Sequence, residues 1–244
     1  MSTKQDWLKY YDDDWARNKN INPPEYLSKR LLKLTQIKLA QISAAIVQPP
    51  RAKNIFLVEQ QPINFIAGFF ASVIAEVNLF LCDPGWQRQE WQQVLGLVKP
   101  DLILGEKTTI DLIHQLESAS GQPAPIVQQG LSSPSLIMIP TGGTSGKLKF
   151  AVHSWQTLAA SVEGFKSFFA CEQINSCCTL PLYHVSGLMQ LMRSFLTQGN
   201  LTICSYKLIT ALPFTLDQSA YFISLIPTQL KFLLAESPKW LGET

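Results

Sequence analysis

The side chains best suited to chemistry in this sequence lie in a glycine-rich stretch, residues 141–149, between two apolar runs. Glycines let backbone N–H groups turn toward an anion, and hydroxyl and ammonium groups add further donors. This is the chemistry needed to bind a triphosphate. The stretch is not a Walker A loop, because the Gly-x-x-x-x-Gly-Lys-Ser/Thr spacing cannot be matched. A plain glycine-rich hairpin is the alternative that the loop alone leaves open.

A second polar group lies in residues 180–194. His184 is expected where a strand passes into a helix, and side chains at such junctions project into a crevice. The structural alternative is a core histidine whose ring nitrogens form hydrogen bonds within the protein. Arg193 follows Ser186 on the same face of the expected helix. It could bind a carboxylate through two parallel hydrogen bonds, or form an ordinary salt bridge on the helix.

The glycine loop resembles the phosphate loop of the AMP-forming acyl-adenylate ligases, whose usual form is Thr-Ser-Gly-Thr-Thr-Gly-x-Pro-Lys. The matching residues are Thr141, Gly143, Thr144, Gly146 and Lys149. The sequence departs from that pattern at three positions, where it has Gly142, Ser145 and Leu148. Leucine in place of proline gives up a pre-set φ angle but no phosphate donor.

Other stretches resemble the o-succinylbenzoate–CoA ligases of menaquinone and phylloquinone synthesis. Residues 180–188 and 191–194 look like the acid-binding segment of that family, and residues 80–86 and 90–94 resemble its plant and cyanobacterial branch. His153 and Trp155 also fit this branch and are interpreted as packing and loop support. The resemblance covers roughly residues 50–235.

The resemblance implies an ATP-dependent acid–thiol ligase that adenylates o-succinylbenzoate and then forms its CoA thioester. ATP, Mg²⁺ and CoA are the implied cofactors and substrates. The implied catalytic residues are His184 and Lys149. The implied ATP phosphate-binding residues are Thr141, Gly142, Gly143, Thr144, Ser145, Gly146, Lys147 and Lys149, although Lys147 reads equally well as a solvated loop charge. The implied acid-binding residues are His184, Ser186, Gly187 and Arg193, with Gly187 small because bulk there would collide with an aromatic acid.

Several parts of the family pattern cannot be assigned in this sequence. A family member would continue past residues 228–230 into a Tyr-Gly-x-Thr-Glu segment, an acidic residue for the ribose and a small lid domain with a catalytic lysine. Residues 1–244 are therefore expected to be a partial N-terminal AMP-binding domain without that lid, and a poor ligase alone. The alternatives are a ligase for another aromatic or a fatty acid, or a catalytically silent fragment that binds a nucleotide or an acid.

Composition narrows the class of protein further. The net charge of +2 gives no electrostatic argument for nucleic acid or an anionic membrane. The apolar stretch 63–82 contains Glu76 and reads as a core helix followed by a strand rather than a membrane span. The five cysteines follow no Cys-x-x-Cys spacing, which favours reduced thiols in a cytoplasmic protein, and the scattered histidines disfavour a zinc site. Oligomeric state is not indicated.

The elements that must position these residues alternate between strand and helix. An amphipathic helix is expected at residues 26–47. Strands are expected at residues 54–58, 78–82, 101–104, 136–139, 150–152, 177–180, 201–204 and 221–225. Helices are expected at residues 62–77, 87–98, 110–116, 156–169, 186–197 and 228–235. This alternation predicts an α/β fold with largely parallel sheets flanked by helices. A boundary near residues 122–125 could separate two sheet subdomains.

Overall fold

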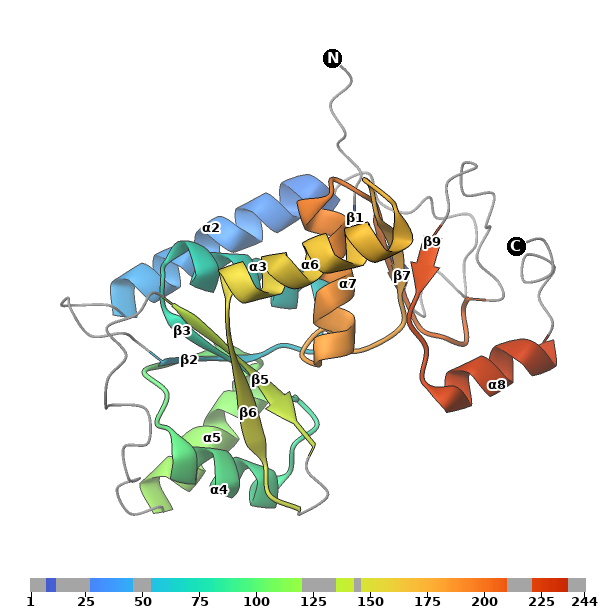
Figure 1. Cartoon of the computed structure of the whole chain (residues 1–244). Helices are drawn as coiled ribbons and strands as arrows, with labels where there is room; N and C mark the ends of the chain where they lie inside the picture. The colour runs from blue at the N-terminus through green and yellow to red at the C-terminus, as the bar shows by residue number, and fades with distance from the viewer. Residues whose placement is uncertain are drawn as a thin grey trace. The chain divides into compact units, whose positions relative to one another are not determined.

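The computed structural model describes residues 8–11, 27–45, 54–119, 135–142, 146–209 and 221–236 (Figure 1). The chain forms two compact units. The first unit is Lys29–Leu158, and the second unit combines Met1–Ser28 with Ala159–Thr244. Within the described residues each unit contains one sheet, and the strands are parallel except for one antiparallel pair in the first unit. The predicted α/β class is therefore confirmed.

The sheet of the first unit has the strand order β4-β2-β3-β5-β6. Its strands are β2 (Asn54–Val58), β3 (Asn78–Leu81), β4 (Leu102–Gly105), β5 (Leu136–Thr141) and β6 (Lys149–Ser154). Strands β2, β3, β4 and β5 are parallel, and β6 returns antiparallel to β5. The central strands are buried on both faces, as expected for apolar runs in a parallel sheet.

Helices cover both faces of this sheet (Figure 1). Helices α2 (Leu27–Ala45) and α3 (Pro62–Ile74) lie on one face, and α4 (Arg88–Leu97) and α5 (Lys107–Ala119) on the other. Helix α3 approaches β2 closely at Gly68, where a Cβ atom would lie 2.5 Å from a methyl carbon of Leu57. Among the residues that the structure describes, no helix is long and apolar enough to cross a membrane.

The core between the sheet and α4 is aromatic and lies beside the glycine loop. Trp91 of α4 is fully buried, and its ring centroid lies 6.3 Å from that of Phe56 and 5.1 Å from that of Trp86. Phe150 of β6 joins this cluster through an edge contact with Phe80 at 5.3 Å. Because large apolar side chains fix α4 against the sheet, α4 is a firm support for residues that contact it.

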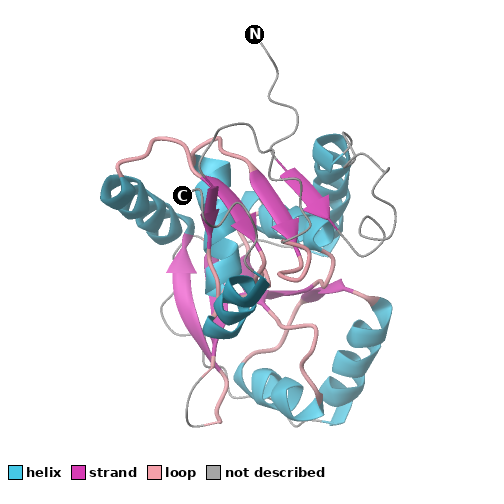
Figure 2. Cartoon of the chain, turned by 90° about the vertical axis from the view of Figure 1, so that its right-hand side faces the viewer, coloured by secondary structure: helices cyan, strands magenta, loops and turns pink. Residues whose placement is uncertain are grey.

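The sheet of the second unit has the strand order β1-β8-β7-β9, with all strands parallel. The strands are β1 (Leu8–Tyr11), β7 (Asn175–Cys178), β8 (Leu201–Cys204) and β9 (Tyr221–Ile223). The helices are α6 (Trp155–Phe169), which begins at the end of the first unit, α7 (Val185–Leu196) and α8 (Pro227–Glu236). Figure 2 shows the short strands in magenta with helices in cyan beside them.

Adjacent cysteines of β7 face opposite sides of that sheet. The Sγ atom of Cys178 lies 4.0 Å from the carbonyl oxygen of Gly187 in α7. Cys177 instead packs with Cys204 and with Leu233 of α8. The second unit therefore buries one sheet face under α7 and the other under α8, as the alternation of side chains along a strand requires.

Most predicted elements agree with the structure, and the differences have local causes. Strand β7 begins at Asn175, two residues before the predicted start, because Asn175 Oδ1 accepts a 2.9 Å hydrogen bond from Asn200 N–H and buries a polar residue in the strand. Helix α5 spans Lys107–Ala119, where the carbonyl of Glu106 accepts from Thr109 and Ile110 N–H. Strand β1 was not predicted.

The predicted division near residues 122–125 is not where the two units separate. Those residues lie outside the described part of the chain, but β4 and β5 on either side of them belong to the same sheet. The units divide instead between Leu158 and Ala159, and between Ser28 and Lys29. The ends of the predicted helix 26–47 also lie outside the described residues.

Candidate functional site

The glycine loop joins the antiparallel strands β5 and β6. Thr141 is the last residue of β5 and pairs with Lys149, the first residue of β6. The Thr141 hydroxyl donates a 3.3 Å hydrogen bond to the carbonyl oxygen of Lys149. Gly142 is exposed, whereas Gly143, Thr144 and Ser145 lie outside the described residues. Strands β5 and β6 therefore form an antiparallel pair that brings the two ends of the loop together at Thr141 and Lys149.

The second half of the loop contains two exposed cations. Lys147 and Lys149 are both exposed, and neither forms an ion pair within the described ranges. Gly146 has a φ angle of +68°, a left-handed conformation that glycine adopts without strain. Ammonium groups left unpaired beside a glycine-rich turn are available to an anion. Among the described residues, neither cation is paired with a carboxylate that would compete with a phosphate ligand.

Gln93 of α4, which is not among the residues expected at the site, contacts this half of the loop. Its Oε1 atom accepts a 2.8 Å hydrogen bond from Leu148 N–H, and its Nε2 atom donates to the carbonyl oxygen of Gly146 at 3.4 Å. The only sequence signal was the position of Gln93 in the stretch 90–94, which resembles the plant and cyanobacterial ligases. A half-buried polar residue on a helix gives no further indication of a partner 55 residues away.

The His184 segment lies in the second unit, between the end of β7 and the start of α7. His184 is the N-cap residue of α7, which confirms its predicted place where a strand passes into a helix. Its backbone N–H donates to Pro181 O at 3.2 Å and its carbonyl accepts from Leu188 N–H at 2.9 Å. Its ring is half-buried, with its centroid 4.7 Å from that of Tyr183. The ring nitrogens bond no described residue, so they are available to a ligand.

Ser186 and Gly187 follow in the first turn of α7 and differ in exposure. Ser186 is exposed and Gly187 is buried. A Cβ atom at residue 187 would collide with the carbonyl oxygen of Pro181 and would lie 2.8 Å from Leu180 O. Glycine is thus required here because the helix packs directly on backbone. The reason expected from the family resemblance was different, namely space for an aromatic acid.

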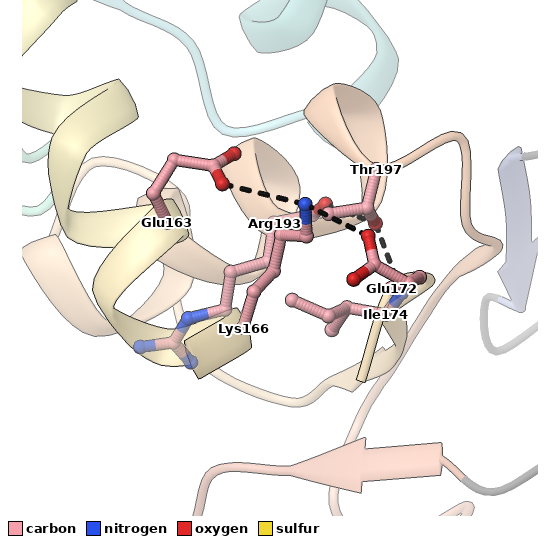
Figure 3. A network of polar contacts seen from close by, with 6 residues as sticks. All are labelled: Glu163, Lys166, Glu172, Ile174, Arg193 and Thr197. Atoms are coloured by element: carbon pink, nitrogen blue, oxygen red, sulfur yellow. Dashed lines mark hydrogen bonds and ion pairs between the residues drawn. The ribbon is translucent and has the colours of Figure 1, made fainter. Parts of the chain in front are cut away.

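Arg193 lies in the last turn of α7 and packs against an aromatic ring. Its Cζ atom is 3.9 Å from the centroid of the Phe165 ring, and burial lowers the pKa of its guanidinium. In Figure 3 the Lys166 ammonium lies between the Glu163 and Glu172 carboxylates, at 3.3 and 3.2 Å, and the Arg193 guanidinium lies away from both. Within the described ranges Arg193 forms no ion pair, so the ordinary helix salt bridge considered from the sequence is not observed.

The predicted site residues thus fall into two groups, one in each unit. Thr141, Gly142, Gly146, Lys147 and Lys149 gather at the β5–β6 hairpin of the first unit. The acid-binding candidates His184, Ser186, Gly187 and Arg193 all belong to α7 or its N-cap in the second unit. Where the structure describes side chains, no group of three or more His, Cys, Asp or Glu residues could hold a metal ion.

The family model of the AMP-binding enzymes matches residues 50–242, which include the glycine loop and the His184 segment. The chain belongs to the AMP-binding enzyme family. This assignment confirms the resemblance to acyl-adenylate ligases that was first read from residues 141–149. A comparison with curated protein sequences gives no match.

Solved structures of acyl-adenylate-forming enzymes share the fold of this chain. The o-succinylbenzoate coenzyme A synthetase (MenE) of Bacillus subtilis in complex with AMP is 17% identical, with a TM-score of 0.68 over 97% of this chain and 62% of that protein. ATP-bound MatB of Rhodopseudomonas palustris is 14% identical, with a TM-score of 0.70 over 96% and 49%. The adenylation domain of a keto acid-selecting NRPS module is 16% identical, with a TM-score of 0.63 over 87% and 41%.

The match spans 62% or less of these three proteins. At these identities the likeness concerns the fold, and the family assignment concerns the general chemistry of adenylate formation. The residues that would bind adenine and ribose are not assigned in this chain.

Proposed function

We propose that this chain is part of an ATP-dependent acid–CoA ligase that activates its acid as an acyl-adenylate. The observation that supports this most is the β5–β6 hairpin, where a glycine-rich turn stands beside the exposed cations Lys147 and Lys149 within the matched family region. Residues 1–244 would be the N-terminal AMP-binding part of that enzyme.

The chemistry explains why such a loop is needed. A carboxylate oxygen attacks the α-phosphorus of ATP, the bond to the β-phosphate oxygen breaks, and pyrophosphate leaves with its negative charge. Donors that hold the β- and γ-phosphates neutralise and orient this leaving group. We assign this role to Thr141, Thr144, Ser145 and Lys149, together with loop N–H groups. A CoA thiolate then attacks the acyl carbonyl carbon, and AMP leaves as the thioester forms.

The acid would bind at the start of α7. The His184 ring bonds no described residue, and the exposed Ser186 hydroxyl lies two residues further along the chain. Either side chain could donate to a carboxylate. Arg193 follows about 10 Å further along the helix axis, a separation that a two-carboxylate acid could span.

We propose o-succinylbenzoate as this acid, in the synthesis of menaquinone or phylloquinone. The motif in residues 180–188 and the similarity to MenE support that choice. The similarity of the fold to MatB and to a keto acid-selecting domain keeps other carboxylic acids as alternatives. All five cysteines are free thiols, which supports a cytoplasmic location.

Mg²⁺ usually accompanies ATP in phosphoryl and adenylyl transfer. The described residues contain no cluster that fits such an ion, so none of the roles above depends on a side chain that ligates it.

Titration calorimetry tests the proposal on the chain as it stands. ATP with Mg²⁺ should bind, and o-succinylbenzoate should bind more tightly than benzoate, malonate or a medium-chain fatty acid. Exchange of labelled pyrophosphate into ATP, dependent on the preferred acid, would establish adenylation. A folded chain that binds no ATP rules the proposal out. If the chain binds ATP but prefers another acid, the proposed reaction stands and that acid replaces o-succinylbenzoate as the proposed substrate.

A further inference from the structure

The side chain of Gln93 uses both polar atoms of its amide on one short stretch of the glycine loop. Its Oε1 atom accepts from Leu148 N–H at 2.8 Å, and its Nε2 atom donates to Gly146 O at 3.4 Å. An amide with one acceptor and one donor turned toward the same backbone matches the N–H and C=O groups on either side of Lys147. A single side chain therefore holds the residue before Lys147 and the residue after it.

We propose that Gln93 is a positioning residue that fixes the phosphate-binding half of the glycine loop. This proposal rests on the function proposed above. Gln93 would act through the loop backbone rather than on the nucleotide. Holding Gly146 and Leu148 sets the direction in which the chain enters β6, and thereby the place of Lys149.

The stretch from Gly146 to Leu148 has few other attachments. Within the described part of the chain, its only hydrogen bonds are the two to Gln93. Space around Gly146 is open, since a Cβ atom there would meet nothing within 4 Å. Leu148 packs against the aromatic core, which supplies one apolar attachment. Without Gln93 the left-handed turn at Gly146 would be free to take other conformations.

Helix α4 is suited to hold a loop in place. The N–H of Gln87, its N-cap residue, donates to Glu90 Oε2 at 2.9 Å within a capping box. Trp91 anchors the middle of the helix in the core. Pre-organised donors need such support, because a displacement of about 1 Å can cost about 100-fold in rate. The link from α4 through Gln93 to the loop supplies it.

The neighbouring Gln92 is a matched control. It has the same side chain on the same helix, but that side chain is exposed and forms no hydrogen bond with a described residue. Gln93→Met keeps the length of the side chain and removes both hydrogen bonds, and Gln92→Met makes the same chemical change without affecting the loop. Gln93→Glu keeps the acceptor for Leu148 N–H but removes the donor to Gly146 O.

Amide hydrogen exchange tests the link directly and needs no nucleotide. In Gln93→Met the Leu148 amide should exchange about tenfold faster or more, because its acceptor is lost. In Gln93→Glu it should stay protected, and Gln92→Met should match the native chain. An unchanged rate in Gln93→Met, with the fold intact by circular dichroism, overturns the proposal.

Calorimetry with ATP and Mg²⁺ tests the consequence. Gln93→Met should weaken ATP binding about fivefold to tenfold relative to Gln92→Met, while acid binding and the midpoint of thermal unfolding stay the same. Faster exchange at Leu148 with unchanged ATP affinity overturns the positioning role. If the native chain itself binds no ATP, the proposed function fails and the positioning role for ATP fails with it, while the exchange rates still establish whether Gln93 holds the loop.

Discussion

Thr141 and Lys149 form the last residue pair of the β5–β6 hairpin, and the Thr141 hydroxyl donates to the Lys149 carbonyl oxygen. The base of the glycine loop is thus closed by a backbone pair and a side-chain bond. Lys149 has a fixed backbone and an exposed ammonium group with no ion pair in the described ranges. Because its backbone is already fixed, this lysine loses only side-chain entropy when it binds a phosphate.

Lys149→Ala should therefore weaken ATP binding without unfolding the chain. The lost charge-assisted contact corresponds to about 1.5–3 kcal/mol, or roughly a 10-fold to 150-fold rise in Kd. Calorimetry with ATP and Mg²⁺ measures it. Lys107→Ala, at an exposed position at the start of α5 and outside the loop, is the control for loss of a lysine. Equal ATP affinity in native and Lys149→Ala chains would remove Lys149 from the site.

The sequence predicted the elements well where apolar runs are regular. The strand Asn54–Val58 has the predicted bounds, because a short run of buried aliphatic and aromatic residues is typical of a strand inside a parallel sheet. The prediction was less accurate where polar residues take part in strands. Asn175 and Ser176 are buried in β7, where each forms a hydrogen bond with the backbone of Asn200. No local sequence pattern indicates a partner so far along the chain.

The candidate site shows the same division. Residue types and spacing made Thr141, Lys149 and His184 candidates before the fold was known. Gln93 could not be found, since its hydrogen bonds depend on how α4 packs against the hairpin, which is a property of the tertiary fold. Gly187 was singled out correctly as a position that needs glycine, but its physical cause is the backbone of Pro181.

Gly187→Ala and Gly164→Ala should change stability in opposite directions. A methyl group at residue 187 must displace backbone, which costs about 1–3 kcal/mol as overpacking. At residue 164, on the exposed side of α6, the same methyl meets open space and should stabilise the helix by about 0.5–1 kcal/mol. Urea unfolding measures both. If Gly187→Ala is as stable as the native chain, glycine at residue 187 is needed to leave space for the ligand and not for packing against the backbone.

His184→Ala should reduce acid binding and leave ATP binding and stability nearly unchanged. The His184 side chain makes no capping hydrogen bond to α7, so its removal costs the helix no cap. Calorimetry with o-succinylbenzoate and with ATP separates the two effects. His114→Ala, at an exposed position of α5, is the control for loss of an imidazole. A loss of both affinities together would instead identify a structural histidine.

Buried thiols should make the protein less stable at alkaline pH. Burial, above all, raises the pKa of Cys178 to about 12 from its ordinary value of 9.0. Above pH 9 the unfolded chain therefore releases a proton that the folded chain retains, and the free energy of unfolding falls as pH rises. The fall should approach about 1.4 kcal/mol per pH unit for this thiol, up to pH 12.

Urea unfolding at pH 7, 9 and 10.5 measures this contribution. Cys178→Ala should show a shallower decline than the native chain, whereas Cys171→Ala, at a half-buried position, controls for the loss of a sulfur atom. The same decline in native and Cys178→Ala chains would show that the Cys178 thiol does not carry this linkage.

The ion pair between Lys38 of α2 and Glu59, the residue after β2, should be the most sensitive charged contact in the first unit. The Nζ and Oε1 atoms are 2.6 Å apart, and the side chains are only 12% and 6% exposed. Lys38→Met leaves a buried carboxylate without its partner and should cost about 3–5 kcal/mol. Lys38→Met with Glu59→Met removes both charges and should recover part of that loss.

Glu172→Ala breaks an ion pair at a 95% exposed side chain and should change stability little. Urea unfolding of the four chains tests this ranking, and a double variant less stable than Lys38→Met would show that the pair is not what holds α2 against β2.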